Sequence, residues 1–91
     1  MTYLSKAQAA LDTAAELING PRQQSYGHPK VNFARISQRM EQILGVEIEP
    51  WKAAQILAEL KMARLAKGWH EDSIHDAIAY LALMMELKDD A

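Results

Sequence analysis

Glycine and proline divide the chain into four segments, and within each segment the apolar residues recur at the spacing of an α-helix. Gly20-Pro21, Gly45 and Gly68 end the first three segments. Glycine readily takes the backbone conformation that closes a helix, and proline cannot continue one. No segment alternates apolar and polar residues in the way of a β-strand. The pattern therefore predicts an all-α fold, a compact four-helix domain with short connections.

Capping residues set the expected bounds of these helices. Ser5 followed by Gln8 is typical of a capping box. Pro50 fits the first turn of a helix, and Asp72 is the expected N-cap of the last one. The expected helices cover residues 5–19, 29 or 30 to 44, 50–67 and 72–88.

The length and composition fit one globular domain, which we place at residues 1–91. The chain is 49% hydrophobic and 24% charged, as globular domains are. Its formal net charge of −2 provides no basic field, so we expect neither a nucleic acid nor an anionic membrane as a partner. The absence of cysteine fits a reducing compartment. Lys6, Asp12 and Glu16 interrupt the N-terminal segment, so we expect neither a signal peptide nor a membrane span.

The last predicted helix is apolar in two separate directions. One direction holds Ile74, Ala77, Ile78, Leu81 and Met85. The other holds Tyr80, Leu83 and Leu87. A four-helix domain has too few neighbouring elements to cover both, and a chain of this length buries only about 60–65% of the surface of its unfolded state. We therefore expect a homo-oligomer formed through the last helix, with Leu83 at the contact.

Two cations lie in the middle of an apolar arc on the third predicted helix. At about 100° per residue, Lys61 and Arg64 both fall within this arc. A buried and unpaired charge destabilises a fold strongly, so the two cations need an anionic partner. Asp72 and Asp76 lie on the last helix, beyond a short turn, and are the carboxylates within reach.

Three interpretations of this cluster remain open from the residues alone. In the first, the cluster is structural, and Arg64 pairs with Asp76. Lys61 then pairs with Asp72 or with a helix end. In the second, Asp76 partly matches Arg64, and Lys61 meets a phosphate-bearing ligand. In the third, Asp72, Asp76 and Glu59 hold a metal ion such as magnesium.

The connection at residues 20–33 is longer and more polar than a link between two helices requires. It holds Arg22, Tyr26 and His28, and Asn32 follows at the start of the next helix. In one interpretation, the loop lines a pocket near a helix N-terminus, where Arg22 and His28 would help to bind a phosphate. In the other, Tyr26 only plugs the end of the bundle and His28 lies in solvent.

Three motifs occur in order along the chain: Tyr-Gly-His-Pro followed by Asn-Phe, then Lys-x-x-Arg, then Asp-Ser-x-x-Asp with a downstream tyrosine. Together they resemble a family of small phage- and prophage-encoded all-α proteins of unknown function, over residues 17–83. The layout is also similar to the phage nucleotide-modification-associated domains. More distantly, the last helix is similar to that of MazG-like nucleotide pyrophosphohydrolases. The resemblance implies a nucleotide ligand and a location in the cytoplasm of a bacterial host.

The positions that match the shared motifs are the ligand-binding residues that the resemblance implies: Tyr26, His28, Asn32, Lys61, Arg64, Asp72, Asp76 and Tyr80. MazG-like enzymes hold magnesium with a Glu-x-x-Glu pair and a later Glu-x-x-Asp. This chain lacks the earlier pair and has Ser73 in place of the later glutamate. The resemblance therefore favours binding over hydrolysis, with no catalytic residue and no cofactor.

The leading hypothesis is an oligomeric phage-type protein that binds a nucleotide or another phosphorylated small molecule. By biological analogy, it would serve anti-defence by sequestering a host nucleotide signal. The first alternative is a magnesium-dependent MazG-like pyrophosphohydrolase or an accessory protein for nucleotide modification. The second is a module that binds a host protein through its last helix, with purely structural charge pairs.

Overall fold

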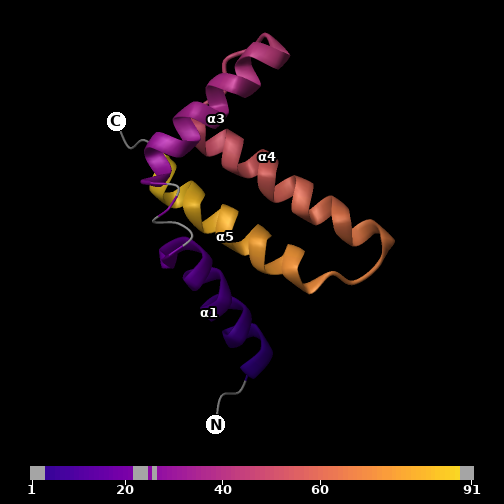
Figure 1. Ribbon diagram of the computed structural model, residues 1–91. Helices are drawn as coiled ribbons and strands as arrows, with labels where there is room; N and C mark the ends of the chain where they lie inside the picture. The colour runs from indigo at the N-terminus through magenta and orange to yellow at the C-terminus, as the bar shows by residue number, and fades with distance from the viewer. Residues whose placement is uncertain (1–3, 22–24, 26, 89–91) are drawn as a thin grey trace.

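The computed structural model describes residues 4–21, 25 and 27–88, and over these residues it is α-helical and has no strand (Figure 1). Four helices of 14 to 17 residues make up most of the chain. Their bounds, with those of a short 3₁₀-helix, are α1 Ser5–Asn19, α3 Pro29–Leu44, α4 Pro50–Ala63, η1 Arg64–Lys67 and α5 Glu71–Leu87. The prediction of an all-α, four-helix fold is confirmed. Within the described ranges, none of the helices combines the length and the apolar content that crossing a membrane requires.

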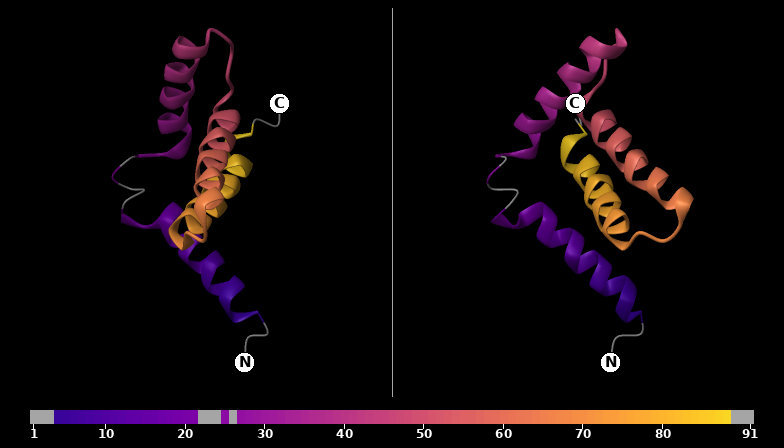
Figure 2. Two further views of the ribbon diagram at one scale, coloured as in Figure 1. Left: turned by 90° about the vertical axis from the view of Figure 1, so that its right-hand side faces the viewer. Right: turned by 45° about the vertical axis from the view of Figure 1, so that its right-hand side comes forward.

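α4 and α5 form an antiparallel hairpin, and the other two helices pack around it (Figure 1). α1 lies along the side of α5 that faces away from α4, and α3 crosses near the start of α4 and the end of α5. Figure 2 shows the N-terminal half of α1 and the C-terminal half of α3 extending beyond the hairpin at opposite ends. The radius of gyration is 14.4 Å, whereas a compact chain of this length would have about 12 Å. The four helices are therefore packed in a more open arrangement than a compact bundle.

Small side chains allow α4 and α5 to pack closely. Ala53, Ala54 and Ala58 on α4 are almost completely buried, and so is Ala77 on α5. Alanine is the strongest helix former and brings no side chain that would hold two backbones apart. The residues that favour the two helices are therefore also the residues that let them approach each other.

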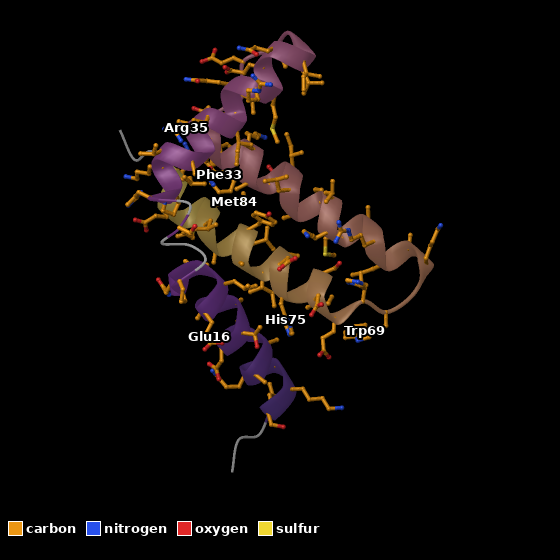
Figure 3. The ribbon with its side chains drawn as sticks, viewed as in Figure 1. Glu16, Phe33, Arg35, Trp69, His75 and Met84 are labelled. Atoms are coloured by element: carbon orange, nitrogen blue, oxygen red, sulfur yellow. The ribbon has the colours of Figure 1, made fainter. Side chains whose placement is uncertain are left out.

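Larger apolar side chains close the hairpin at the end where α3 crosses it. Phe33 on α3 (Figure 3), Ile48 in the following loop, and Leu83 and Leu87 on α5 are buried in one cluster. Glu41 Oε2 accepts a hydrogen bond from the backbone N–H of Ile48 at 2.7 Å, which holds the loop against this cluster. The expectation that Leu83 contacts a second copy is therefore wrong, because α3 and the loop after it already cover that side of α5.

Histidine side chains cap two of the helices. At the start of α3, His28 Nδ1 accepts a hydrogen bond from the backbone N–H of Lys30 at 3.1 Å. At the start of α5, His70 Nδ1 accepts from the backbone N–H of Ser73 at 3.2 Å, so the N-cap is His70 and not Asp72 as predicted. The Nδ1 atom is attached to Cγ, as the capping oxygen of asparagine is, and can reach the same N–H groups. Asp72 instead lies in the first turn, where a carboxylate interacts favourably with the helix dipole.

We predict that enlarging a buried alanine between α4 and α5 will destabilise the fold. Ala54→Leu should lower the free energy of unfolding by about 1–3 kcal/mol, because the added side chain has no room between the two backbones. Ala63→Leu, at an exposed position on the opposite side of α4, is the matched control and should change the stability little. Urea denaturation followed by circular dichroism measures both, and equal stability of the two variants would contradict the close packing.

Candidate functional site

A cavity of about 410 Å³ opens where α1, α3, α4 and α5 meet. All four helices contribute to its apolar lining, which consists of Leu17, Ile18, Phe33, Ile36, Leu57, Ala79 and Leu83. The remaining lining residues carry polar groups: Asn32, Lys61, Asp76 and Tyr80. All four of these were assigned to a ligand from the sequence, so the structure brings this part of the expected site together.

An ion pair in the cavity wall joins α4 to α5. The Nζ atom of Lys61 lies 2.9 Å from Oδ2 of Asp76. The side chain of Lys61 is 15% exposed and that of Asp76 is 34% exposed, so water reaches the pair only in part. The two charges neutralise each other, yet the ammonium keeps further N–H donors and the carboxylate keeps its second oxygen. The pair can therefore offer both a donor and an acceptor to a molecule in the cavity.

This pair differs from the predicted one, in which Arg64 was the partner of Asp76. Arg64 is exposed, and it begins η1, where the expected α-helix to Lys67 tightens into a 3₁₀-helix. Three residues advance an α-helix by about 4.5 Å. In the antiparallel hairpin, Lys61 is level with Asp76, and Arg64 lies further along, towards the turn into α5. The position of the two cations around the helix axis does not distinguish them, but their position along it does.

Two uncharged polar side chains face the cavity beside the ion pair. The rings of Tyr80 and Phe33 pack edge to face, with centroids 6.3 Å apart and planes at 78°. Asn32 stands on α3, one residue before Phe33. Within the described part of the chain, neither the Asn32 amide nor the Tyr80 hydroxyl forms a hydrogen bond to protein. Both groups are therefore available to a ligand.

The other predicted site residues that the structure describes do not line the cavity. The His28 side chain caps α3 and is exposed, and Asp72 is exposed in the first turn of α5. Glu59 is exposed on α4. Among the described residues, no three His, Asp or Glu side chains form a group that could hold a metal ion, so Asp72, Asp76 and Glu59 do not converge. Arg22 and Tyr26 lie outside the described residues.

The apolar walls of the cavity were not identified from the sequence as part of a site. Ile18 on α1 and Ile36 on α3 recur at helical spacing, as residues of a closed core also do. Periodicity shows which side of a helix is covered, but it does not show whether the neighbouring helices meet without a gap. Leu17 and Leu57 could not be distinguished from core residues for the same reason.

A second, smaller hollow of about 270 Å³ lies beside Trp51 at the start of α4. Trp51 Nε1 donates a hydrogen bond to Glu49 Oε2 at 2.7 Å. The ammonium groups of Lys52 and Lys88 lie 4.7 and 5.6 Å from the centroid of the indole ring. The charged residues of the lining are Lys30, Glu49 and Lys88. The tryptophan is thus fixed by its own neighbours, and a carboxylate among the lysines weakens the attraction of this hollow for an anion.

Comparison with known proteins relates the chain to phage proteins. A family model described as a domain of unknown function, DUF6378, matches residues 9–88. The chain is 38% identical to the Gene 55 protein of Mycobacterium phage L5 over 84 residues, which are 88% of this chain and 54% of that protein. It is 35% identical to the Gene 55 protein of Mycobacterium phage D29 over 75 residues, which are 81% of this chain and 50% of that protein. The chain thus spans about half the length of the curated relatives that it matches, and no solved structure matches it.

We predict that Lys61 and Asp76 are energetically coupled and that Arg64 and Asp76 are not. In a double-mutant cycle with Lys61→Met and Asp76→Asn, the coupling energy should be about 1 kcal/mol, as expected for a partly exposed ion pair. The same cycle with Arg64→Met is the matched control and should give additive effects on the free energy of unfolding. A larger coupling for Arg64 than for Lys61 in urea denaturation would contradict the observed pair.

Proposed function

Because the chain belongs to the DUF6378 family, a domain of unknown function, we propose its function from the geometry of the cavity. We propose that the cavity binds a small ligand of the nucleoside class, free or as part of a nucleotide, and that the protein holds this ligand without turnover. A volume of about 410 Å³ lies within the range of about 300–1,000 Å³ that is usual for small-molecule sites. Such sites are mostly apolar and contain a few fixed polar groups, as this cavity does.

The observation that carries the proposal is the neutral ion pair beside an aromatic wall. A nucleobase has flat apolar faces and an edge that both donates and accepts hydrogen bonds. Tyr80 and Phe33 provide aromatic surface for its faces. Lys61 can donate to its edge and Asp76 can accept from it. The Asn32 amide, which is a donor and an acceptor, lies in the same lining.

The charge balance favours the nucleoside part of such a ligand over its phosphate. Lys61 was expected to meet a phosphate as a free cation, but it is paired with Asp76. A phosphate close to Lys61 would also be close to the Asp76 carboxylate, which repels it. We therefore expect the base and ribose to provide most of the binding free energy, and we expect the affinity to depend little on salt concentration.

A protein that holds a nucleotide without converting it could act by sequestration. The relatives of this chain named above are phage proteins, and their names state no activity. For a phage, holding a nucleotide signal of the host would be an anti-defence function. This role rests on the binding proposal and adds no residue to it.

We predict that Asn32→Leu will weaken the binding of a nucleoside about tenfold, which corresponds to the loss of one hydrogen bond. The substitution keeps the size of the side chain, and folding should be unaffected because the Asn32 amide has no hydrogen-bond partner among the described residues. Gln38→Leu is the matched control, since Gln38 lies on the same helix, is exposed and does not line the cavity. Calorimetric titration against a panel of nucleosides and their mono- and triphosphates measures the affinities.

The same panel decides whether the protein binds or converts its ligand. Incubation with nucleoside triphosphates and magnesium should release no pyrophosphate. Release that requires magnesium would favour the pyrophosphohydrolase alternative. If no member of the panel binds at millimolar concentration, or if Asn32→Leu binds as tightly as the wild type, the proposed function is wrong.

A further inference from the structure

We infer that the outer side of α5 is a homodimer interface, in which α5 packs antiparallel against α5 of a second copy. Four apolar residues form a stripe along this side, which we call the outer stripe: Ile74, Ile78, Leu81 and Met85. This surface lies away from the cavity, so the inference is independent of the proposed function.

The outer stripe is the part of α5 that the chain itself leaves open. Its residues are spaced by four, three and four positions, which places them on one side of an α-helix. Met85 is 84% exposed and Leu81 is 51% exposed, while Ile74 and Ile78 are half-buried at the edge of the neighbouring helices. The remaining sides of α5 pack against α1, α3 and α4. Of the two apolar directions expected from the sequence, the one that holds Leu83 is covered within the chain, and the one that holds Met85 is left open.

The exposed area of the chain matches what an obligate dimer needs. The accessible surface is 6956 Å², whereas a compact monomer of this mass would expose about 5,300 Å². If each subunit buried the difference of about 1,600 Å², the interface would total about 3,300 Å², within the range of about 2,000–5,000 Å² for obligate homodimers. The outer stripe would form its centre, and the end of α1 that extends beyond the hairpin provides further area (Figure 2).

The sequence of the outer stripe fits a second copy of itself. The stripe carries no formal charge, so a two-fold axis would bring no like charges together at its centre. With the axis at the middle of the stripe, Ile74 lies opposite Met85 of the partner subunit. Ile78 then lies opposite Leu81 of the partner subunit. Residues that lie opposite each other in an antiparallel pair of identical helices have a constant sum of residue numbers. Both pairs sum to 159, so a single register brings all four residues of the stripe opposite one another.

The same register also matches the charged flank of α5. His75 and Glu86 lie on the same side of the outer stripe, and their numbers sum to 161. A two-fold axis perpendicular to two antiparallel helices places the same flank of both helices on the same side of the interface. His75 therefore lies beside Glu86 of the partner subunit, offset by two residues or about 3 Å along the helix. A partner with a different sequence would not be expected to satisfy both the stripe and the flank.

We predict that Met85→Glu will convert a dimer into a monomer. The wild type should sediment at twice the chain mass of 10.2 kDa at micromolar concentration. The Met85→Glu variant should sediment as a single chain with unchanged helix content, because this side chain makes little contact within its own subunit. Ile43→Glu, at a position on α3 that is 82% exposed, is the matched control and should stay dimeric.

Cysteine cross-linking tests the register, since the natural chain has no cysteine. Equivalent positions 74 or 85 of the two subunits would lie about 16 Å apart along the helices, too far for a disulfide. Ile74→Cys and Met85→Cys should therefore each fail to cross-link alone and should cross-link at least tenfold more when the two variants are mixed and oxidised. A monomeric wild type, a dimeric Met85→Glu variant, or self-linking of either cysteine variant without mixed linking would overturn the inference.

Discussion

The close antiparallel packing of α4 against α5 is the interaction on which the rest of the structure depends. It is possible because small side chains are buried on both helices: Ala54 and Ala58 on α4 and Ala77 on α5 are at most 3% exposed. This approach brings Lys61 to within 2.9 Å of Asp76 and forms one wall of the cavity. Larger residues at the same positions would separate the two helices and with them the two charges. The polar chemistry of the site is thus a consequence of alanines that do not themselves take part in it.

Most of the fold could be predicted from the sequence because its helix signals are local. Gly45, with φ of 73°, takes the left-handed conformation that glycine favours at the end of a helix, and Pro50 begins the next helix as expected. The errors concern groups with several possible partners. Asp72 has the right chemistry for an N-cap, but the His70 ring nitrogen reaches the Ser73 N–H instead. Propensity indicates which residue types favour the N-cap position, but geometry decides which of two neighbouring side chains reaches the free backbone N–H group.

The polar residues of the candidate site could be predicted from the sequence, but the ion pair that two of them form could not. Asn32, Lys61, Asp76 and Tyr80 were named from the sequence and all line the cavity. The partner of Asp76 was assigned to Arg64, because a helical wheel contains the angle of a residue but not its height along the axis. Height follows only from the register between two helices, which the turn after α4 fixes through its 3₁₀ geometry. The apolar walls were unpredictable for a different reason. The same apolar residues line a cavity or fill a core, and the sequence pattern does not show whether space is left between the helices.

The cavity and the proposed dimer interface lie on different sides of the same helix, α5. Asp76, Tyr80 and Leu83 lie on the side that faces the cavity, and Leu81 and Met85 lie on the side that the chain leaves open. A cavity in a small domain removes apolar contacts that a filled core would provide, and alanines contribute little buried area to replace them. A chain of this size must therefore find stabilisation elsewhere, and oligomerisation is a common source for small domains. The proposed interface would supply it from the opposite side of the same helix, so that the cavity can stay open to a ligand while the helix that forms its wall is held in place.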